Sequence, residues 1–190
     1  MNTMIKFWPE NLSKDFTDAI IDVGNKQPIA KTGIGFNAST ESIEDIRRSE
    51  IRWLNTYDQS HRFIVETLWN FINDANRDHF GFNINYLRDI QYTTYRAEET
   101  GKYDWHEDIF WINPTANHRK LSLTIQLSDP NEYEGGEFEI DPEHGVLNQQ
   151  LIKKRGTVLV FPSFLRHRVT PVTSGIRRSL VCWVEGPKFR

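Results

Sequence analysis

A change in the spacing of apolar residues constrains the fold of this 190-residue chain more than any other feature. Up to Arg77 the apolar residues recur every three or four positions, which is the period of an amphipathic helix. Beyond Arg77 they alternate with polar residues nearly to the C-terminus, which is the period of a β-strand. We therefore expect helices followed by a mainly β domain.

The N-terminal part contains two helical stripes. The first runs from Pro9 to Val23 and ends at Gly24, and the second starts at Ser60, a residue type that favours the N-cap position. The apolar residues of the second stripe are Ile64, Leu68, Phe71, Ile72 and Ala75. Both stripes predict helices that pack against a neighbouring layer rather than carry chemistry.

The rest of the chain divides into about eight short alternating runs separated by polar turns. One predicted turn, Thr173–Gly175, separates a run at His167–Val172 from a run at Arg177–Val184. This order of elements predicts a β barrel or jelly roll flanked by N-terminal helices. The length fits a single domain over 1–190, with a helical buttress at about 1–80 and a jelly-roll core at about 81–187.

The cleanest alternation lies at Leu121–Ser128, where Leu and Ile occupy the odd-numbered positions and Ser, Thr and Gln occupy the even-numbered ones. One face of this strand must pack in a core. The polar face meets either solvent or the interior of a barrel that holds a polar ligand. Both interpretations remain open from the sequence.

The composition excludes several classes of protein. A formal charge of −3 and a pI near 6.1 give no general attraction to nucleic acid or to anionic membranes. The single cysteine, Cys182, excludes an internal disulfide. The first ten residues contain no apolar core of a signal peptide, and no later run reaches the ~20 apolar residues of a membrane span. We expect a soluble, cytoplasmic protein without nucleic-acid or membrane partners.

A candidate metal site begins with His106 and Asp108, which stand two positions apart in a strand-like run and so share one face. An imidazole and a carboxylate, joined by a second imidazole, form the two-His, one-carboxylate set of non-haem iron(II) oxygenases. The pair alone is weak evidence, since most such pairs are surface residues. Among the other histidines His167 is the best third ligand, because it begins a strand directly after the apolar run Val158–Phe161 and a turn.

Two arginine positions raise the question of anion binding. Arg177 lies on an otherwise apolar strand, and a buried guanidinium needs an anion. That anion is either an Asp or Glu of the protein or a dicarboxylic co-substrate held by two hydrogen bonds. The pair Arg47–Arg48 could contact a substrate, but a solvated face is the commoner role of such a pair.

The pattern of His106, Asp108, His167 and Arg177 resembles the iron(II)/2-oxoglutarate-dependent dioxygenases of the prolyl 4-hydroxylase-like group, especially the bacterial PKHD-type hydroxylases. The resemblance covers roughly Tyr92 to Trp183. Beyond the four residues, it is carried by the segments Leu121–Pro130, Tyr133–Glu137, Phe161–Ser163 and His167–Val172.

The resemblance implies a double-stranded β-helix, the jelly roll of that group, in which His106, Asp108 and His167 hold Fe(II). It also implies that 2-oxoglutarate chelates the metal at one end while Arg177 binds its distal carboxylate. The further co-substrate contacts that it implies are Tyr95 and Gln126, although prolyl hydroxylases often have tyrosine at the latter position. The residues that it places near the substrate are Trp183 and Arg119, for which a core aromatic and a solvated arginine are the respective alternatives.

The function implied by the resemblance is a dioxygenase that uses Fe(II), 2-oxoglutarate and O2, with ascorbate as a further cofactor. Its expected reaction is hydroxylation of a prolyl residue in a protein or peptide, with release of succinate and CO2. One alternative is an oxygenase of the same kind that acts on a small molecule such as a free amino acid. Another is a jelly-roll module that binds a metal or ligand without catalysis, although structural zinc prefers a closed set of four ligands.

Overall fold

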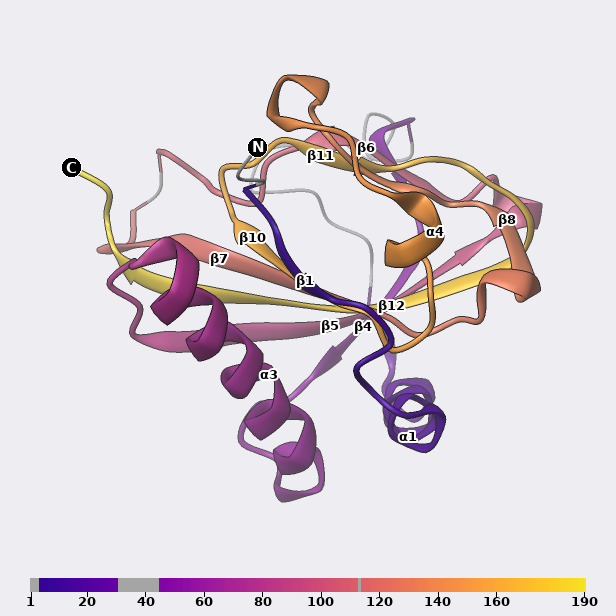
Figure 1. The fold of residues 1–190 in the computed structure, drawn as a ribbon. Helices are drawn as coiled ribbons and strands as arrows, with labels where there is room; N and C mark the ends of the chain where they lie inside the picture. The colour runs from indigo at the N-terminus through magenta and orange to yellow at the C-terminus, as the bar shows by residue number, and fades with distance from the viewer. Residues whose placement is uncertain (1–3, 31–44, 113) are drawn as a thin grey trace.

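The computed structural model describes residues 4–30, 45–112 and 114–190, which form two facing β-sheets with helices on one side (Figure 1). Within these residues the larger sheet has eight strands, in the order β1-β10-β7-β12-β5-β4-β2, and β8 pairs with β12 outside this path. Its strands are β1 (Lys6–Trp8), β2 (Ile29–Ala30), β4 (Glu50–Leu54), β5 (Tyr86–Arg96), β7 (Asn117–Gln126), β8 (Tyr133–Gly135), β10 (Val158–Pro162) and β12 (Val172–Pro187).

The smaller sheet has four described strands in the order β3-β6-β11-β9, and all its pairings are antiparallel. These strands are β3 (Arg47–Arg48), β6 (Lys102–His106), β9 (Phe138–Ile140) and β11 (His167–Val169). The two facing antiparallel sheets form the expected jelly roll, with a mainly β core and helices from the N-terminal part.

Two helices cover the outer face of the larger sheet (Figure 1). Helix α1 (Lys14–Asn25) starts after Ser13, whose hydroxyl accepts a hydrogen bond from the Phe16 amide. The helix therefore begins later than predicted, and strand β1 lies before it. Helix α3 (Arg62–Ala75) is preceded by a single turn capped by Asp58 rather than by Ser60. The short helix α4 (Gln149–Ile152) lies near the other sheet. Among the described residues no helix is long and apolar enough to span a membrane.

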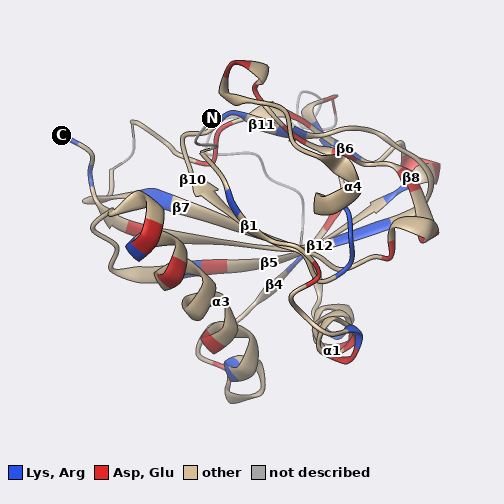
Figure 2. Ribbon diagram, viewed as in Figure 1, with Lys and Arg blue, Asp and Glu red and all other residues tan. Residues whose placement is uncertain are grey.

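The helices bury their apolar stripes against the larger sheet. Charged residues of α3 lie on its outward side (Figure 2), while Ile64, Leu68 and Ile72 are buried against the sheet. Gly24 does not end α1 as predicted: it lies within the helix, where a Cβ atom would come 2.5 Å from the Tyr92 ring. The absence of a side chain here lets the helix pack closely on the sheet.

Strand β7 separates the two interior regions of the protein. Its leucines and isoleucine belong to the core shared with the helices. Its polar face is also buried, since the side chains of Ser122, Thr124 and Gln126 are at most 4% exposed. The interior interpretation of this polar face is therefore correct, and the solvent interpretation is wrong.

Several strands differ from the sequence-based expectation. The predicted turn Thr173–Gly175 lies inside the long strand β12, because Val172–Gly175 pair with β8 through a shift in register and Gly175 takes a positive φ of 70°. Strand β5 is continuous from Tyr86 to Arg96. The region before residue 80 supplies strands β1 to β4 as well as helices.

Candidate active site

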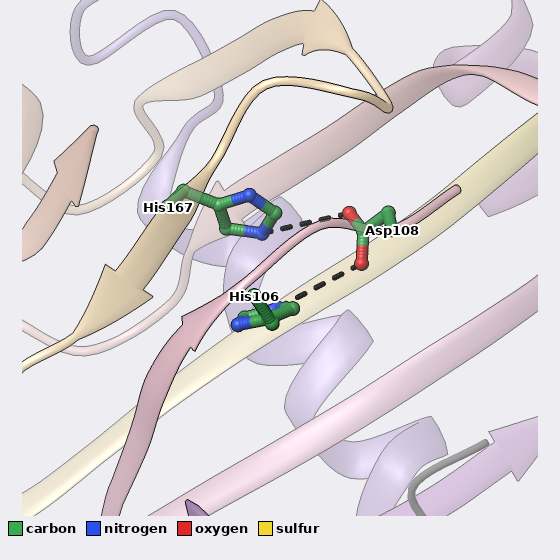
Figure 3. Close-up of side chains that lie close together, drawn as sticks. All are labelled: His106, Asp108 and His167. Carbon is green, nitrogen blue, oxygen red and sulfur yellow. Dashed lines mark ion pairs between the residues drawn. The ribbon is translucent and has the colours of Figure 1, made fainter. Parts of the chain in front are cut away.

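The three predicted metal ligands meet at one end of the smaller sheet (Figure 3). His106 is the last residue of β6 and His167 the first of β11, and their Cα atoms are partners across the sheet. Asp108 lies two residues beyond the end of β6 rather than within the strand, and its amide donates a hydrogen bond to the carbonyl oxygen of Ser163 at 2.9 Å. Strand pairing therefore fixes the positions of the two histidines, and this hydrogen bond fixes the position of the Asp108 backbone.

The donor atoms of these residues fit a single divalent cation. His106 Nε2 lies 3.8 Å from Asp108 Oδ1, and His167 Nε2 lies 3.5 Å from Asp108 Oδ2. Two donors of one ion lie at most ~4.4 Å apart when each is about 2.2 Å from it. Two neutral nitrogens and one carboxylate oxygen, with the remaining positions open, are the donors that non-haem iron(II) takes.

Backbone hydrogen bonds orient both imidazoles toward that point. His106 Nδ1 lies 2.7 Å from the Asp104 carbonyl oxygen, and His167 Nδ1 lies 2.8 Å from the Leu165 carbonyl oxygen. Because a carbonyl oxygen can only accept, each Nδ1 carries the proton and each Nε2 keeps its lone pair. The Nε2 lone pairs are thus available for a metal on the side of Asp108.

The electrostatics of the site keep its ligands in their binding forms. Burial, and after it the neighbouring His167, lowers the pKa of His106 to about 3, so the His106 imidazole is neutral near pH 7. Burial alone would raise the pKa of Asp108, but the neighbouring His167, His106 and Arg119 outweigh it and lower that pKa. The Ser122 hydroxyl also donates a hydrogen bond to Asp108 Oδ2 at 2.7 Å, which holds the carboxylate in place.

A cavity leads from these ligands between the two sheets. Its wall contains apolar residues and a few polar groups, among them Tyr95, Arg177, Trp183 and the three candidate ligands.

Arg177 is the largest buried cation in this wall, with a side chain 1% exposed. One Nη donates to Gln126 Oε1 at 2.9 Å, whereas its Nε has no hydrogen-bond partner. No carboxylate of the described residues lies within ion-pair distance of Arg177, so an internal anion is absent from this part of the chain. A buried guanidinium of this kind fits an anion that enters the cavity.

The other two predicted co-substrate residues both contact Arg177. Tyr95 is its cross-strand partner on β5, and the guanidinium carbon lies 5.3 Å from the Tyr95 ring centroid. Gln126 lies outside the cavity wall and binds Arg177. A direct contact of Gln126 with 2-oxoglutarate stays a prediction, and the geometry gives it the position of a residue that orients Arg177.

The two predicted substrate residues form one stacked pair. The Arg119 guanidinium lies 4.0 Å from the centroid of Trp183 and 5.5 Å from that of Phe110. One Arg119 Nη also lies 3.4 Å from the carbonyl oxygen of Asp108. Burial lowers the pKa of Arg119, so this residue is not the solvated arginine of the alternative interpretation. Trp183 lines the cavity, and its indole Nε1 is buried without a hydrogen-bond partner.

One residue of the site, Tyr103, was not singled out in the sequence, and for Arg47 the favoured interpretation was a solvated face rather than a substrate contact. Tyr103 stacks on the His106 ring with centroids 3.5 Å apart, and burial raises the pKa of Tyr103 to about 12. Arg47, expected on a solvated face, is buried in the cavity wall, 4.6 Å from the Tyr103 ring centroid. Strand β3 is only two residues long, too short for alternation to reveal that Arg47 and Arg48 face opposite ways. A buried role could have been inferred only from the pairing of Arg47 with Tyr103 across the sheet.

Comparisons with curated proteins point to hydroxylases. A PKHD-type hydroxylase from Synechococcus sp. (strain CC9311) is 41% identical over 91 residues, which are 47% of this chain and 39% of that relative. A PKHD-type hydroxylase from Acidovorax ebreus (strain TPSY) is 36% identical over 94 residues, 47% of this chain and 40% of that relative. The match thus spans about two fifths of the length of these relatives.

Solved structures show the same fold at low sequence identity. A prolyl-4-hydroxylase from Pseudomonas putida aligns with a TM-score of 0.72 and 18% identity, covering 97% of this chain and 94% of the other. A prolyl hydroxylase from Trichoplax adhaerens, solved with a hypoxia inducible factor peptide fragment, aligns with a TM-score of 0.76 and 15% identity, covering 96% of this chain and 84% of the other.

The family itself is given by a match to the C-terminal half of the chain. The model of the 2OG-Fe(II) oxygenase superfamily matches residues 90–185, about half of the sequence. This segment contains all three candidate ligands and Arg177. The chain therefore belongs to the 2OG-Fe(II) oxygenase superfamily, whose members use Fe(II) and 2-oxoglutarate.

Proposed function

We propose that this protein is an Fe(II)- and 2-oxoglutarate-dependent dioxygenase that hydroxylates a prolyl residue in a protein or peptide and releases succinate and CO2. One observation carries the proposal: a single cavity has the candidate ligands His106, Asp108 and His167 and the buried, unpaired Nε of Arg177 in its wall. A metal site and a site for a dicarboxylate in one cavity match the needs of this chemistry.

In the proposed enzyme, His106, Asp108 and His167 hold Fe(II), which together with 2-oxoglutarate and O2 supplies the oxidising power for an unactivated C–H bond. Arg177 binds the distal carboxylate of 2-oxoglutarate, and Tyr95 packs beside the guanidinium.

The protein also positions these groups and limits the access of water. Backbone hydrogen bonds keep the imidazole Nε2 atoms free, and Ser122 holds Asp108. Apolar wall residues, Phe138, Phe161 and Val169, keep water from the space between the sheets.

A prolyl substrate is supported by the names of the relatives and by the wall near the metal ligands. Two solved neighbours are named prolyl hydroxylases, and one of them was solved with a peptide. The stacked pair of Trp183 and Arg119 lies beside Asp108 and offers an aromatic face to a substrate ring. A cytoplasmic location and the use of ascorbate stay predictions.

The non-catalytic alternative is disfavoured by the ligand set. A structural zinc site takes four protein ligands. The cluster found among the described residues has three, and Cys182 belongs to the core shared with the helices, where burial raises the pKa of its thiol. A metal held by these three residues would keep coordination positions for ligands that enter the cavity.

The substrate can be tested by mass spectrometry. The protein is incubated with Fe(II), 2-oxoglutarate and O2 together with either a set of proline-containing peptides or free L-proline. We expect a mass gain of one oxygen on proline in a peptide, and no gain on matched peptides with alanine in its place. Hydroxylation of free proline alone would favour the small-molecule alternative, and succinate formation without any hydroxylated peptide would contradict the prolyl substrate.

A further inference from the structure

A second arginine of the cavity wall has no role in the chemistry described so far. Arg47 on β3 is 6% exposed. Its Nε donates to Ser49 Oγ at 2.8 Å, and its guanidinium packs on the Tyr103 ring. One of its terminal nitrogens, Nη2, is buried without a hydrogen-bond partner.

The described residues supply no counter-charge for Arg47. None of their carboxylates lies within ion-pair distance of its guanidinium, although two neighbouring arginines, Arg52 and Arg96, both reach Glu50. Arg47 is thus the second cation of the cavity wall, besides Arg177, that has a buried nitrogen without a partner. Keeping a buried cation without an anion is unfavourable, so each of the two positions favours an anionic ligand.

The distal carboxylate of the co-substrate can satisfy only one of these arginines. In the proposed enzyme one end of 2-oxoglutarate is at the metal, and its distal carboxylate is at Arg177. Arg47 lies elsewhere in the wall, against Tyr103, whose ring stacks on the ligand His106. A planar guanidinium with free N–H groups selects a carboxylate by two parallel hydrogen bonds.

We propose, building on the function proposed above, that Arg47 binds a carboxylate of the substrate, so that the enzyme acts on an acidic substrate. The carboxylate comes either from an Asp or Glu side chain close to the hydroxylated residue of a peptide or from the α-carboxylate of a free amino acid. Both sources offer the same chemistry to Arg47.

Two pairs of probes separate the sources of the carboxylate. One pair is N-acetyl-L-proline and N-acetyl-L-prolinamide, and the other is a blocked peptide Ala-Pro-Asp-Ala and its Asn counterpart. Their binding is measured by calorimetry on protein loaded with Mn(II) and 2-oxoglutarate, so that no turnover is needed. We expect the acidic member of at least one pair to bind about tenfold or more tightly than its amide. The pair that shows the preference identifies the source.

The variant Arg47→Gln tests the residue, and Arg48→Gln is the matched control, because it removes the same charge from the neighbouring position of β3. The preference should fall to about one in Arg47→Gln and persist in Arg48→Gln. Arg47→Lys should retain only part of it, because lysine keeps the positive charge but not the planar guanidinium that stacks on Tyr103. Thermal unfolding shows whether each variant is folded. The proposal is overturned if the wild-type protein shows no preference for the acidic probe in either pair. It is also overturned if the preference survives in folded Arg47→Gln.

The proposed function and this inference fail in different ways. Succinate formation by the wild-type protein without substrate tests the proposed function, whereas the preference for acidic probes tests the assignment of Arg47. If wild-type protein forms no succinate, the proposed function is wrong. If succinate forms but acidic and amide probes bind alike, only the assignment of Arg47 is wrong.

Discussion

At the scale of single residues, the candidate ligand Asp108 differs from the nearby Asp104 in its burial and in the hydrogen bond that its carboxylate accepts. Asp108 is 6% exposed and bonded to Ser122, whereas Asp104, four residues earlier, is exposed. Asp108→Ala should abolish succinate formation while the fold is retained, because a ligand is lost, whereas the backbone hydrogen bond of residue 108 to Ser163 and the contact between the Ser122 and Ser163 hydroxyls remain. Asp104→Ala is the matched control, since only the backbone carbonyl of Asp104 contacts His106. Equal activity of both variants would remove Asp108 from the metal site.

Arg177 offers a test that separates co-substrate binding from stability. Arg177→Gln should raise the 2-oxoglutarate concentration needed for half-maximal succinate formation by about 10- to 150-fold, equivalent to the ~1.5–3 kcal/mol of a charge-assisted hydrogen bond. The stability of the protein without ligands should change by less than about 1 kcal/mol, because Arg177 has no ion pair among the described residues. A large loss of stability with an unchanged 2-oxoglutarate requirement would assign Arg177 a structural role.

The lowered pKa of His106 predicts a pH dependence for the metal-free protein. The imidazole is neutral in the folded state down to about pH 3 but takes up a proton near pH 6.5 when unfolded. Acidification from pH 6.5 toward 3 therefore favours the unfolded state, and the thermal midpoint should fall across this window. Replacement by asparagine, His106→Asn, should flatten the fall, as followed by thermal unfolding at a series of pH values. An identical pH profile for the two proteins would show that His106 is not buried as a neutral group.

At the scale of elements, the turn after β8 makes room for the co-substrate arginine. A Cβ atom on Gly136 would lie 2.8 Å from Arg177 Cδ, and this glycine has a φ of 61°. Gly136→Ala should therefore displace Arg177 and raise the 2-oxoglutarate requirement, in addition to a ~1 kcal/mol loss from the left-handed backbone.

Gly81 provides the matched control for this substitution. Its φ is 63°, and no atom lies within 4 Å of a Cβ placed there. Gly81→Ala should thus lose similar stability and keep the wild-type 2-oxoglutarate requirement. If Gly136→Ala and Gly81→Ala need the same 2-oxoglutarate concentration for half-maximal succinate formation, the steric explanation for Gly136 is contradicted.

The elements also show which parts of the site can be inferred from the sequence and which cannot. The alternation in β7 predicted a buried face and left its polar face undecided, because the period of a strand does not reveal what lies opposite. The spacing of His106 and Asp108 singled out the pair, although Asp108 lies beyond the strand and is held by a hydrogen bond to Ser163. The burial of Arg47 was missed because a two-residue strand has no detectable period, and that burial depends on pairing with residues more than fifty positions away.

At the scale of the whole molecule, the two sheets have separate tasks. The larger sheet has its apolar face against the helices, and its inner face contributes Arg177, Tyr95 and Trp183 to the cavity. Basic residues of β7 and β12 therefore lie within the large sheet rather than only at its rim (Figure 2). The smaller sheet contributes the two histidines and Arg47. Two buried guanidiniums and the three candidate ligands in the wall of one cavity are the arrangement on which the proposed chemistry depends.

The most direct test of the proposed oxygenase is anaerobic addition of Fe(II) and 2-oxoglutarate to the metal-free protein, followed by admission of O2 and an assay for succinate. We predict a weak visible charge-transfer band under anaerobic conditions, loss of the band when O2 enters, and formation of succinate, with neither band nor succinate in Asp108→Ala. Folded wild-type protein that gives no band and no succinate would contradict the central claim, and the jelly roll would then bind its ligands without catalysis.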